Sequence, residues 1–191
     1  MKLFFIFLSA ILVNNFVLSK FLGICPFLGV SKKISSASGM SMAVIFVMVI
    51  SSVITWFLNL LLVKLGLEFL TTIVFILVIA TLVQFIEFYI KKVSPNLYEA
   101  LGIYLPLITT NCAILGLALI NVMNNYTLIE TIIYSLGAGL GFGMALIIFS
   151  AIRERMDYYD VPEPFKGTAI ALITAGLLSM AFMGFSGLIK I

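Results

Sequence analysis

The two cysteines are the residues of this chain whose type and spacing favour metal chemistry. Each begins the pattern Cys-x-x-Leu-Gly, as Cys25-Pro-Phe-Leu-Gly29 and as Cys112-Ala-Ile-Leu-Gly116. The chain has no histidine, which is the commonest metal ligand. Thiolates select Zn, Cu(I) or iron–sulfur clusters, and an iron–sulfur cluster usually takes four of them. A cluster site built on Cys25 and Cys112 therefore needs two further thiols from a partner.

Two other interpretations of these cysteines stay open at this point. A free cysteine is often a small buried hydrophobe, and the two thiols could also form a disulfide, although membrane depth gives little reason for one. The matched settings of Cys25 and Cys112 favour the metal interpretation over both.

The composition is that of an integral membrane protein. The 191 residues are 63% hydrophobic and 10% charged, with a mean hydropathy of +1.25, whereas soluble domains carry about 25% charged residues. The net charge of +3 is small, and it gives no reason to expect a nucleic-acid partner. The lipid bilayer is the expected environment.

Charged residues divide the chain into six candidate membrane spans, since a spanning helix needs about 20 mostly apolar residues. The predicted spans are residues 3–19, 34–63, 69–86, 100–129, 131–152 and 167–189. The first is interrupted after Val13 by Asn14, Asn15 and further breakers, and the fourth by Pro106 and residues 109–111. Freed backbone groups are tolerated at membrane depth only inside protein or beside a water-filled cavity. Both broken spans are therefore expected to face the protein interior, with residues 21–31 as a half-helix or re-entrant turn.

The two halves of the chain look like copies of one three-helix unit. Besides the cysteine pattern, the second and fifth spans share Gly39-Met-Ser-Met-Ala43 and Gly141-Phe-Gly-Met-Ala145, and the third and sixth share a weaker Leu-x-x-Ala-x-Leu pattern. An odd number of spans per copy inverts the second copy, and broken helices in matching positions point to a site near the midplane. The sequence thus predicts a single all-α membrane domain over 1–191, with inverted repeats at about 1–94 and 95–191. Chance similarity in an apolar chain is the alternative.

Lysine and arginine set the predicted orientation. One side collects Lys20, Lys32, Lys33, Lys91, Lys92, Arg153, Arg155 and Lys166, and the other only Lys2, Lys64 and Lys190. The first side is predicted to be cytoplasmic, which places both termini outside. The charged stretch 153–166 is expected to be a solvated cytoplasmic loop, with docking of a peripheral subunit as the alternative.

A run of alternating glycines, Gly137, Gly139, Gly141 and Gly143, resembles a nucleotide-binding loop only superficially. It lies in an uncharged span without a preceding strand, so we expect Gly-x-x-x-Gly helix packing instead. Polar residues Thr109, Thr110 and Asn111 are expected to hydrogen-bond the broken helix, with an ion path as the alternative.

Several motifs of the chain closely resemble the family of A-type subunits of the Rnf ion-translocating ferredoxin:NAD⁺ oxidoreductase complex. These motifs span nearly the whole sequence: 13–18, 20–33, 101–113, 151–155, 160–165 and 173–177. A sister family, the E-type subunits of the Na⁺-translocating NADH:quinone reductase, is less similar at Asn14-Asn15-Phe16 and Cys25-Pro26-Phe27.

The resemblance implies an electron-relay subunit of a translocase in a bacterial or archaeal cytoplasmic membrane, with no complete active site of its own. In the Rnf complex, the A-type and E-type subunits form an inverted pair, and each gives two cysteines to a shared [2Fe-2S] cluster. Cys25 and Cys112 match these positions. The B, C, D and G subunits are the other implied partners, and electron transfer is coupled to Na⁺ or H⁺ transport. The rival hypotheses are the equivalent quinone-reductase subunit, a stand-alone inverted-repeat transporter and a scaffold with inert cysteines.

Overall fold

The computed structural model describes residues 2–93, 105–159 and 162–184, and every regular element among them is a helix. Four helices are long and apolar enough to cross a membrane, and two shorter apolar helices lie at Leu3–Val13 and Thr168–Met183. The prediction of an all-α membrane protein is confirmed at this level. Three of these four spans correspond to the long helices α3 (Ile34–Leu65), α4 (Thr71–Val93) and α8 (Leu128–Met156), and the fourth, Pro106–Met123, takes in α6 (Leu105–Thr109) and α7 (Cys112–Met123). The shorter helices are α1 (Lys2–Leu8), α2 (Ile24–Val30) and α9 (Thr168–Met183).

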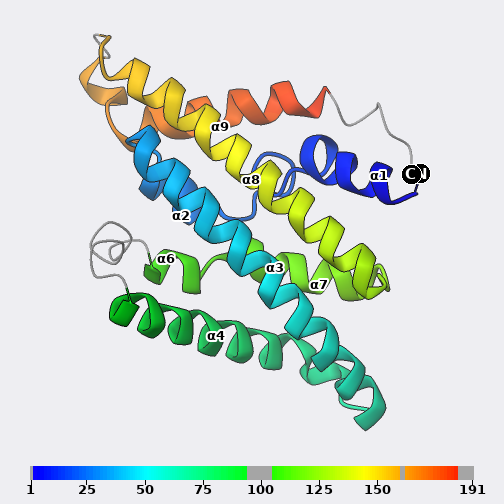
Figure 1. Cartoon of the computed structure of the whole chain (residues 1–191). Helices are drawn as coiled ribbons and strands as arrows, with labels where there is room; N and C mark the ends of the chain where they lie inside the picture. The colour runs from blue at the N-terminus through cyan, green and yellow to red at the C-terminus, as the bar shows by residue number, and fades with distance from the viewer. Residues whose placement is uncertain (1, 94–104, 160–161, 185–191) are drawn as a thin grey trace.

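Helices α3 and α8 lie side by side, run in opposite directions and form the centre of the molecule (Figure 1). The alternating glycines of α8 make this approach possible. A Cβ atom at Gly143 would lie 3.1 Å from Cβ of Ser41, and one at Gly139 would lie 3.0 Å from Cγ1 of Ile45, both on α3. The predicted use of these glycines for helix packing is confirmed.

The other two glycines of the run bring the first span against α8. A Cβ atom at Gly137 would lie 3.0 Å from the carbonyl oxygen of Phe7, and one at Gly141 would lie 3.0 Å from that of Ile11. Alternate glycines of one helix thus serve two different neighbours. Substitution by any larger residue would push either α3 or the first span away from α8.

The first span breaks where the sequence predicts it. Helix α1 continues into a π-helical turn at Ser9–Val13, and residues 14–23 are then non-helical before α2 begins. At the end of this turn, Asn14 Nδ2 donates a hydrogen bond to Ser9 Oγ at 3.0 Å, so the side chains of the two residues pair with each other. The predicted half-helix within 21–31 is the seven-residue α2.

The fourth span breaks between α6 and α7, at Thr110 and Asn111. Asn111 is the N-cap of α7, and its side-chain oxygen accepts a hydrogen bond from the backbone N–H of Ala113 at 3.0 Å. Thr110 Oγ1 donates to the carbonyl of Pro106 at 2.9 Å. These bonds confirm, for Thr110 and Asn111, the expectation that polar residues hydrogen-bond the broken helix.

Several span boundaries differ from the prediction, mostly because charge alone does not end a helix: α4, for example, continues through Glu87 to Val93. Helix α8 starts at Leu128 with a capping box of Thr127 and Glu130 and runs to Met156, so it contains Arg153 and Arg155. The helix of the fourth span ends at Met123. Helix α9 begins at Thr168, next to the predicted start of the sixth span. Parts of two predicted spans, 100–104 and 185–189, lie outside the described residues, as does Lys190.

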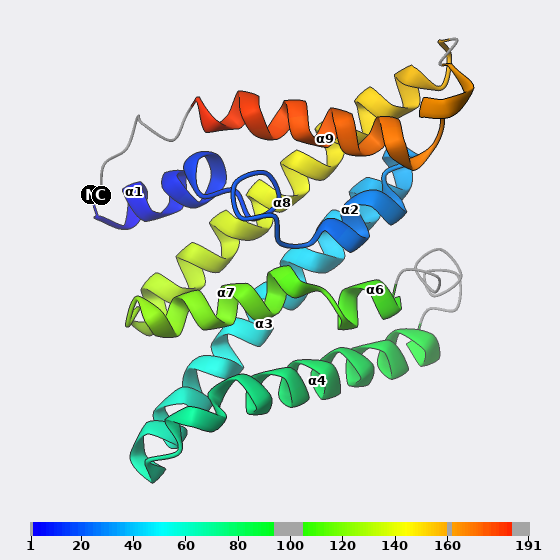
Figure 2. The same cartoon turned by 180° about the vertical axis from the view of Figure 1, so that it is seen from behind.

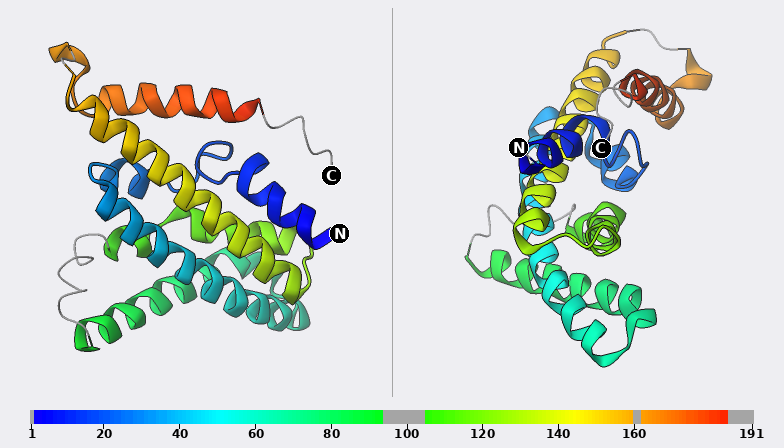
Figure 3. Two further views of the ribbon diagram at one scale, coloured as in Figure 1. Left: turned by 45° about the horizontal axis from the view of Figure 1, so that its top comes forward. Right: turned by 90° about the vertical axis from the view of Figure 1, so that its right-hand side faces the viewer.

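The short helices lie on one face of the central pair. Seen from behind, α2, α6 and α7 lie in front of α3 and α8 (Figure 2). Helix α4 contacts α3, α6 and α7, while α9 contacts α8 and the π-helical turn. The edge-on view separates α4 and α9 to opposite ends of the molecule (Figure 3). The cysteine-bearing segments therefore lie between the outer helices.

Candidate metal-ligand site at the two helix breaks

The two helix breaks meet in space, although 89 residues separate the contacting positions. The backbone N–H of Gly23 donates a hydrogen bond to Sγ of Cys112 at 2.9 Å. Gly23 is the N-cap of α2, two residues before Cys25, and Cys112 is the first residue of α7. The fold thus places the first residue of one Cys-x-x-Leu-Gly pattern against the backbone two residues before the other.

Gly23 permits this contact through its backbone and its lack of a side chain. Its φ is +82°, a left-handed conformation that glycine adopts without steric cost. A Cβ atom there would lie 2.7 Å from the Phe142 ring, 3.2 Å from Cβ of Ala113 and 3.3 Å from the side-chain oxygen of Asn111. The position is therefore closed to every other residue unless α7 or α8 shifts.

Cys25 and Cys112 are both free thiols, and both are exposed on the surface of the chain. The structure therefore contains no disulfide between Cys25 and Cys112. Within the described ranges, no group of three or more His, Cys, Asp or Glu residues is arranged to hold a metal ion. The donor set of this chain is two thiols, which fits half of a four-thiol site and leaves both residues accessible to a partner.

Helix α2, which carries Cys25, is held by the C-terminal end of α8. The rings of Phe27 and Phe149 stack at 4.1 Å between centroids. One turn further along α8, Nη1 of Arg153 donates to the carbonyl of Leu28 at 2.8 Å and to Oγ of Ser31 at 2.9 Å. A cation at the C-terminal end of a helix is favourable because of the helix dipole.

Arg153 corrects the prediction of a solvated loop over 153–166. Its side chain is only 9% exposed, and the residue lies in α8 rather than in a loop. The neighbouring Glu154 accepts a hydrogen bond from the backbone N–H of Ile34, the first residue of α3, at 3.3 Å. Two consecutive α8 residues thus fix the turn between α2 and α3, whereas Asp157 and Lys166 are exposed as expected.

Asn15 organises the first break from inside the protein. The residue is fully buried, and its Nδ2 donates to the carbonyl of Gly141 at 2.8 Å. Its Oδ1 accepts from the backbone N–H groups of Val17 and Leu18 at 3.0 and 3.3 Å. This explains how non-helical backbone is tolerated at membrane depth.

Sequence reasoning identified Asn15 only as a helix breaker and missed the role of Arg153. An amide inside an apolar run is the signal that points to a structural hub, since a buried amide must find partners. For Arg153 the available signal was its place within one turn of an uncharged span, because cationic side chains near a helix end often bind backbone carbonyls.

Comparisons with known proteins point to one family of membrane subunits. A family model described as "Rnf-Nqr subunit, membrane protein" matches residues 3–189. Two relatives are each 59% identical: the A-type subunit of an ion-translocating oxidoreductase complex from Thioalkalivibrio sulfidiphilus, over 97% of both chains, and the A-type subunit of a Na⁺-translocating ferredoxin:NAD⁺ oxidoreductase complex from Acetobacterium woodii, over 98% of both. The A-type subunit of an ion-translocating oxidoreductase complex from Aliivibrio salmonicida is 58% identical over 96% of both chains.

The matched region takes in every feature described above. Residues 3–189 include both cysteine-bearing breaks, the glycine run of α8 and the α8 end that holds α2. The identity to the relatives also extends over nearly the full length of each chain. The chain belongs to the Rnf-Nqr family of membrane subunits.

Proposed function

We propose that this chain is an electron-relay subunit of an ion-translocating oxidoreductase complex of the Rnf type, and that Cys25 and Cys112 are two of the four ligands of a [2Fe-2S] cluster. The observation that supports this proposal most directly is a pair of free, exposed thiols at two helix breaks. The hydrogen bond from Gly23 N–H to the Cys112 sulfur holds the two breaks together. The relatives named as A-type subunits of ion-translocating complexes support the assignment to such a complex.

The chemistry of the donor set supports the cofactor. A bound [2Fe-2S] cluster would supply a one-electron carrier within the membrane domain. The chain's own contribution is to hold two thiolates in place and to donate the Gly23 N–H to one sulfur. Hydrogen bonds to sulfur and burial both shift cluster potentials.

The missing two thiols define the partner. The proposal assigns them to the E subunit of the complex, an inverted companion of this chain, with the B, C, D and G subunits completing the complex. Two observations favour a membrane partner over a second site within the chain: both thiols are exposed, and the described residues offer no third ligand beside them.

We further propose that the membrane domain consists of six spans in two inverted repeats. The close approach of Ser41 and Gly143 supports this, because the two residues occupy equivalent places in the matched Gly39–Ala43 and Gly141–Ala145 segments. Equivalent residues meet each other only near a pseudo-two-fold axis. The interruption of the first and fourth helical segments near each cysteine is the second support.

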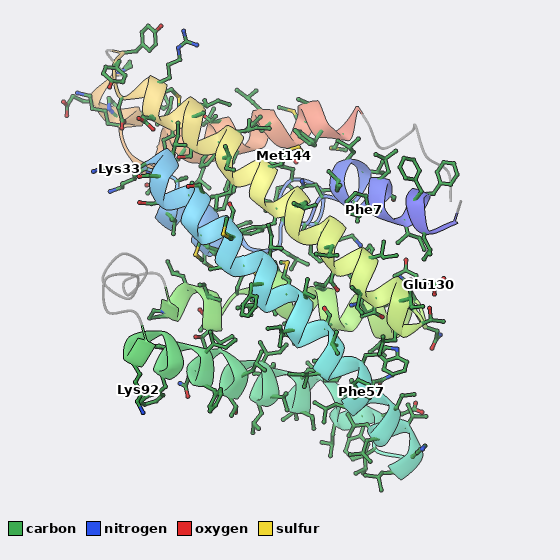
Figure 4. The ribbon with its side chains drawn as sticks, viewed as in Figure 1. Phe7, Lys33, Phe57, Lys92, Glu130 and Met144 are labelled. Carbon is green, nitrogen blue, oxygen red and sulfur yellow. The ribbon has the colours of Figure 1, made fainter. Side chains whose placement is uncertain are left out.

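The proposed location is the cytoplasmic membrane of a bacterium or archaeon, with both termini outside. The arrangement of charges supports this orientation. Lys33 and Lys92 lie toward the left of Figure 4, as does the α8–α9 connection, whereas Phe57 and Glu130 lie toward the right. Most basic helix ends are therefore gathered on one side, with Lys64 at the end of α3 on the other, and the positive-inside rule makes the more basic side the cytoplasmic face.

The test uses the complete complex, purified with the wild-type chain or with Cys25→Ser or Cys112→Ser. We expect a [2Fe-2S]-type EPR signal in the reduced wild type. Either substitution should abolish that signal and lower the iron content by about two per complex, because two irons share the four thiolates. Thr110→Ser, a change at the same break that keeps both thiols, serves as the control and should preserve the signal.

Assembly is measured in parallel by gel filtration and subunit staining. Loss of signal in an assembled complex supports the shared cluster. If the signal and iron survive in both cysteine variants, the cysteines are not ligands, and the scaffold role becomes the explanation for this chain.

A further inference from the structure

We propose that a polar cavity between α3, α7 and the start of α8 binds a small monovalent cation of the Na⁺ class. This inference deepens the proposed function, on which it rests, since it places an ion site in this chain. It is separate from the cysteine site, because no residue of the cavity lining belongs to either helix break. The cavity has a volume of about 280 Å³, and its polar lining includes Ser52, Thr55, Asn59, Asn121, Asn125 and Thr127.

The cavity contains buried polar atoms whose bonding capacity is unused within the described chain. Asn121 is 5% exposed, and neither its side-chain oxygen nor its nitrogen has a hydrogen-bond partner among the described residues. The hydroxyl of Ser52, which is 1% exposed, also has none there. A buried amide or hydroxyl without a partner destabilises the folded state, so two of them on one cavity indicate that something polar occupies it.

The donor set selects the class of occupant. The lining offers neutral oxygens from amide and hydroxyl groups, and the described residues that form it include no carboxylate, thiol or imidazole. Ca²⁺ and Mg²⁺ sites are built around carboxylates, and transition metals prefer nitrogen and sulfur ligands. Thr55 Oγ1 uses its hydrogen to donate to the carbonyl of Ser51 at 2.8 Å, so its oxygen lone pairs are not used in that bond. Neutral oxygens of this kind suit a singly charged hard cation.

The local electrostatics favour positive charge. Helix α7 ends at Met123, so the negative end of its dipole lies at this cavity. The opposing positive end of α8 is neutralised by Glu130, whose Oε2 accepts hydrogen bonds from both the backbone N–H and the hydroxyl of Thr127 at 3.0 Å. A cation in the cavity therefore meets a net favourable field.

One rigid element joins the cavity to the cysteine site. Helix α7 begins at Cys112 and carries Asn121 nine residues later, which corresponds to about 14 Å along the axis. A shift of the Cys112 end of α7 would therefore be transmitted to Asn121 without passing through a loop. This continuity is the physical basis on which a cation here would respond to the state of the cysteine site.

The experiment counts Na⁺ bound to the purified complex, using ²²Na⁺ at equilibrium in choline-based buffer. Asn121→Leu is expected to bind one Na⁺ fewer per complex than the wild type. Ser150→Ala is the matched control, because Ser150 is another buried hydroxyl without a partner among the described residues but does not line the cavity. It should bind as many Na⁺ ions as the wild type.

A second variant keeps the inference testable if Asn121→Leu does not assemble. Asn121→Asp adds a carboxylate at the same position and is expected to tighten Na⁺ binding about tenfold. An unchanged Na⁺ count in Asn121→Leu, or unchanged affinity in Asn121→Asp, overturns the inference and assigns the cavity to water. The EPR signal of the same samples tests the cluster proposal separately. If the signal is present and the Na⁺ count is unchanged, the cation proposal fails and the cluster proposal stands.

Discussion

At the scale of single residues, Gly23 meets three structural requirements at once. Its N–H reaches the Cys112 sulfur, its φ is left-handed, and the Phe142 ring fills the space beside its Cα. Glycine alone meets the second and third of these demands together. The residue therefore couples the backbone of one break to the side chain of the other.

Gly23→Ala is expected to destabilise the chain by about 2–4 kcal/mol, which combines the left-handed backbone cost with the overpacking cost against Phe142. The measurement is thermal unfolding of the purified complex, followed with the iron content. Gly66→Ala is the matched control, since Gly66 has φ of +68° but no neighbour within 4 Å of its Cβ position. A similar loss of stability in both variants would show that the Phe142 contact contributes nothing.

At the scale of elements, α2 is too short to be stable alone, because isolated helices of fewer than about 12 residues are marginal even in favourable sequences. It owes its position to α8 through the stack of Phe27 on Phe149 and the bonds from Arg153 to Leu28 and Ser31. The place of Cys25 thus depends on the end of a helix that lies far away in the sequence.

Arg153→Met is expected to leave the Leu28 carbonyl and the Ser31 hydroxyl without their charged donor, at a cost of about 1.5–3 kcal/mol. Because Arg153 acts on Cys25 through α2, the informative readout is the lineshape of the reduced-state EPR signal, which should shift in this variant. Arg153→Lys should restore it in part, since lysine keeps the charge but not the planar geometry of the guanidinium.

Arg155→Met is the control for that experiment, because Arg155 is exposed, whereas Arg153 is buried against α2. Its spectrum should equal that of the wild type. Identical spectra for Arg153→Met and the wild type would show that Arg153 does not position Cys25, even if the substitution lowers stability.

At the scale of the whole molecule, the proposed orientation in the membrane follows from where the basic residues gather. Exposed Lys32 and Lys33 lie at the start of α3, exposed Lys92 near the end of α4, and exposed Lys166 just before α9. The labelled Lys33 and Lys92 lie on the same side of the fold (Figure 4).

An alkaline phosphatase fusion at residue 191 is expected to be active, because that enzyme folds only outside the cytoplasm, whereas a fusion after Glu163 should be inactive. The positive-inside rule is the physical reason. Enzyme activity per unit of fusion protein is the measurement, and green fluorescence from matched fusions gives the complementary pattern. Activity only in the Glu163 fusion would invert the proposed topology.

The sequence by itself determined the membrane class, the two helix breaks and the family. Scarcity of charge, runs of apolar residues and the placement of Asn14, Pro106 and Asn111 are local properties, and local properties are what a sequence states directly. The glycine run likewise predicted close packing, since only small residues permit it. The assignment of Cys25 and Cys112 to a cluster stays a prediction.

Only the tertiary structure decided which distant partners those residues meet. The bond from Asn15 to Gly141, the burial of Arg153 against Leu28 and the polar cavity at Asn121 each join segments far apart in the chain. No local pattern encodes such pairings, because a buried amide or guanidinium requires a partner without specifying where in the sequence it lies. The fold supplies that partner by bringing α2, α7 and α8 together.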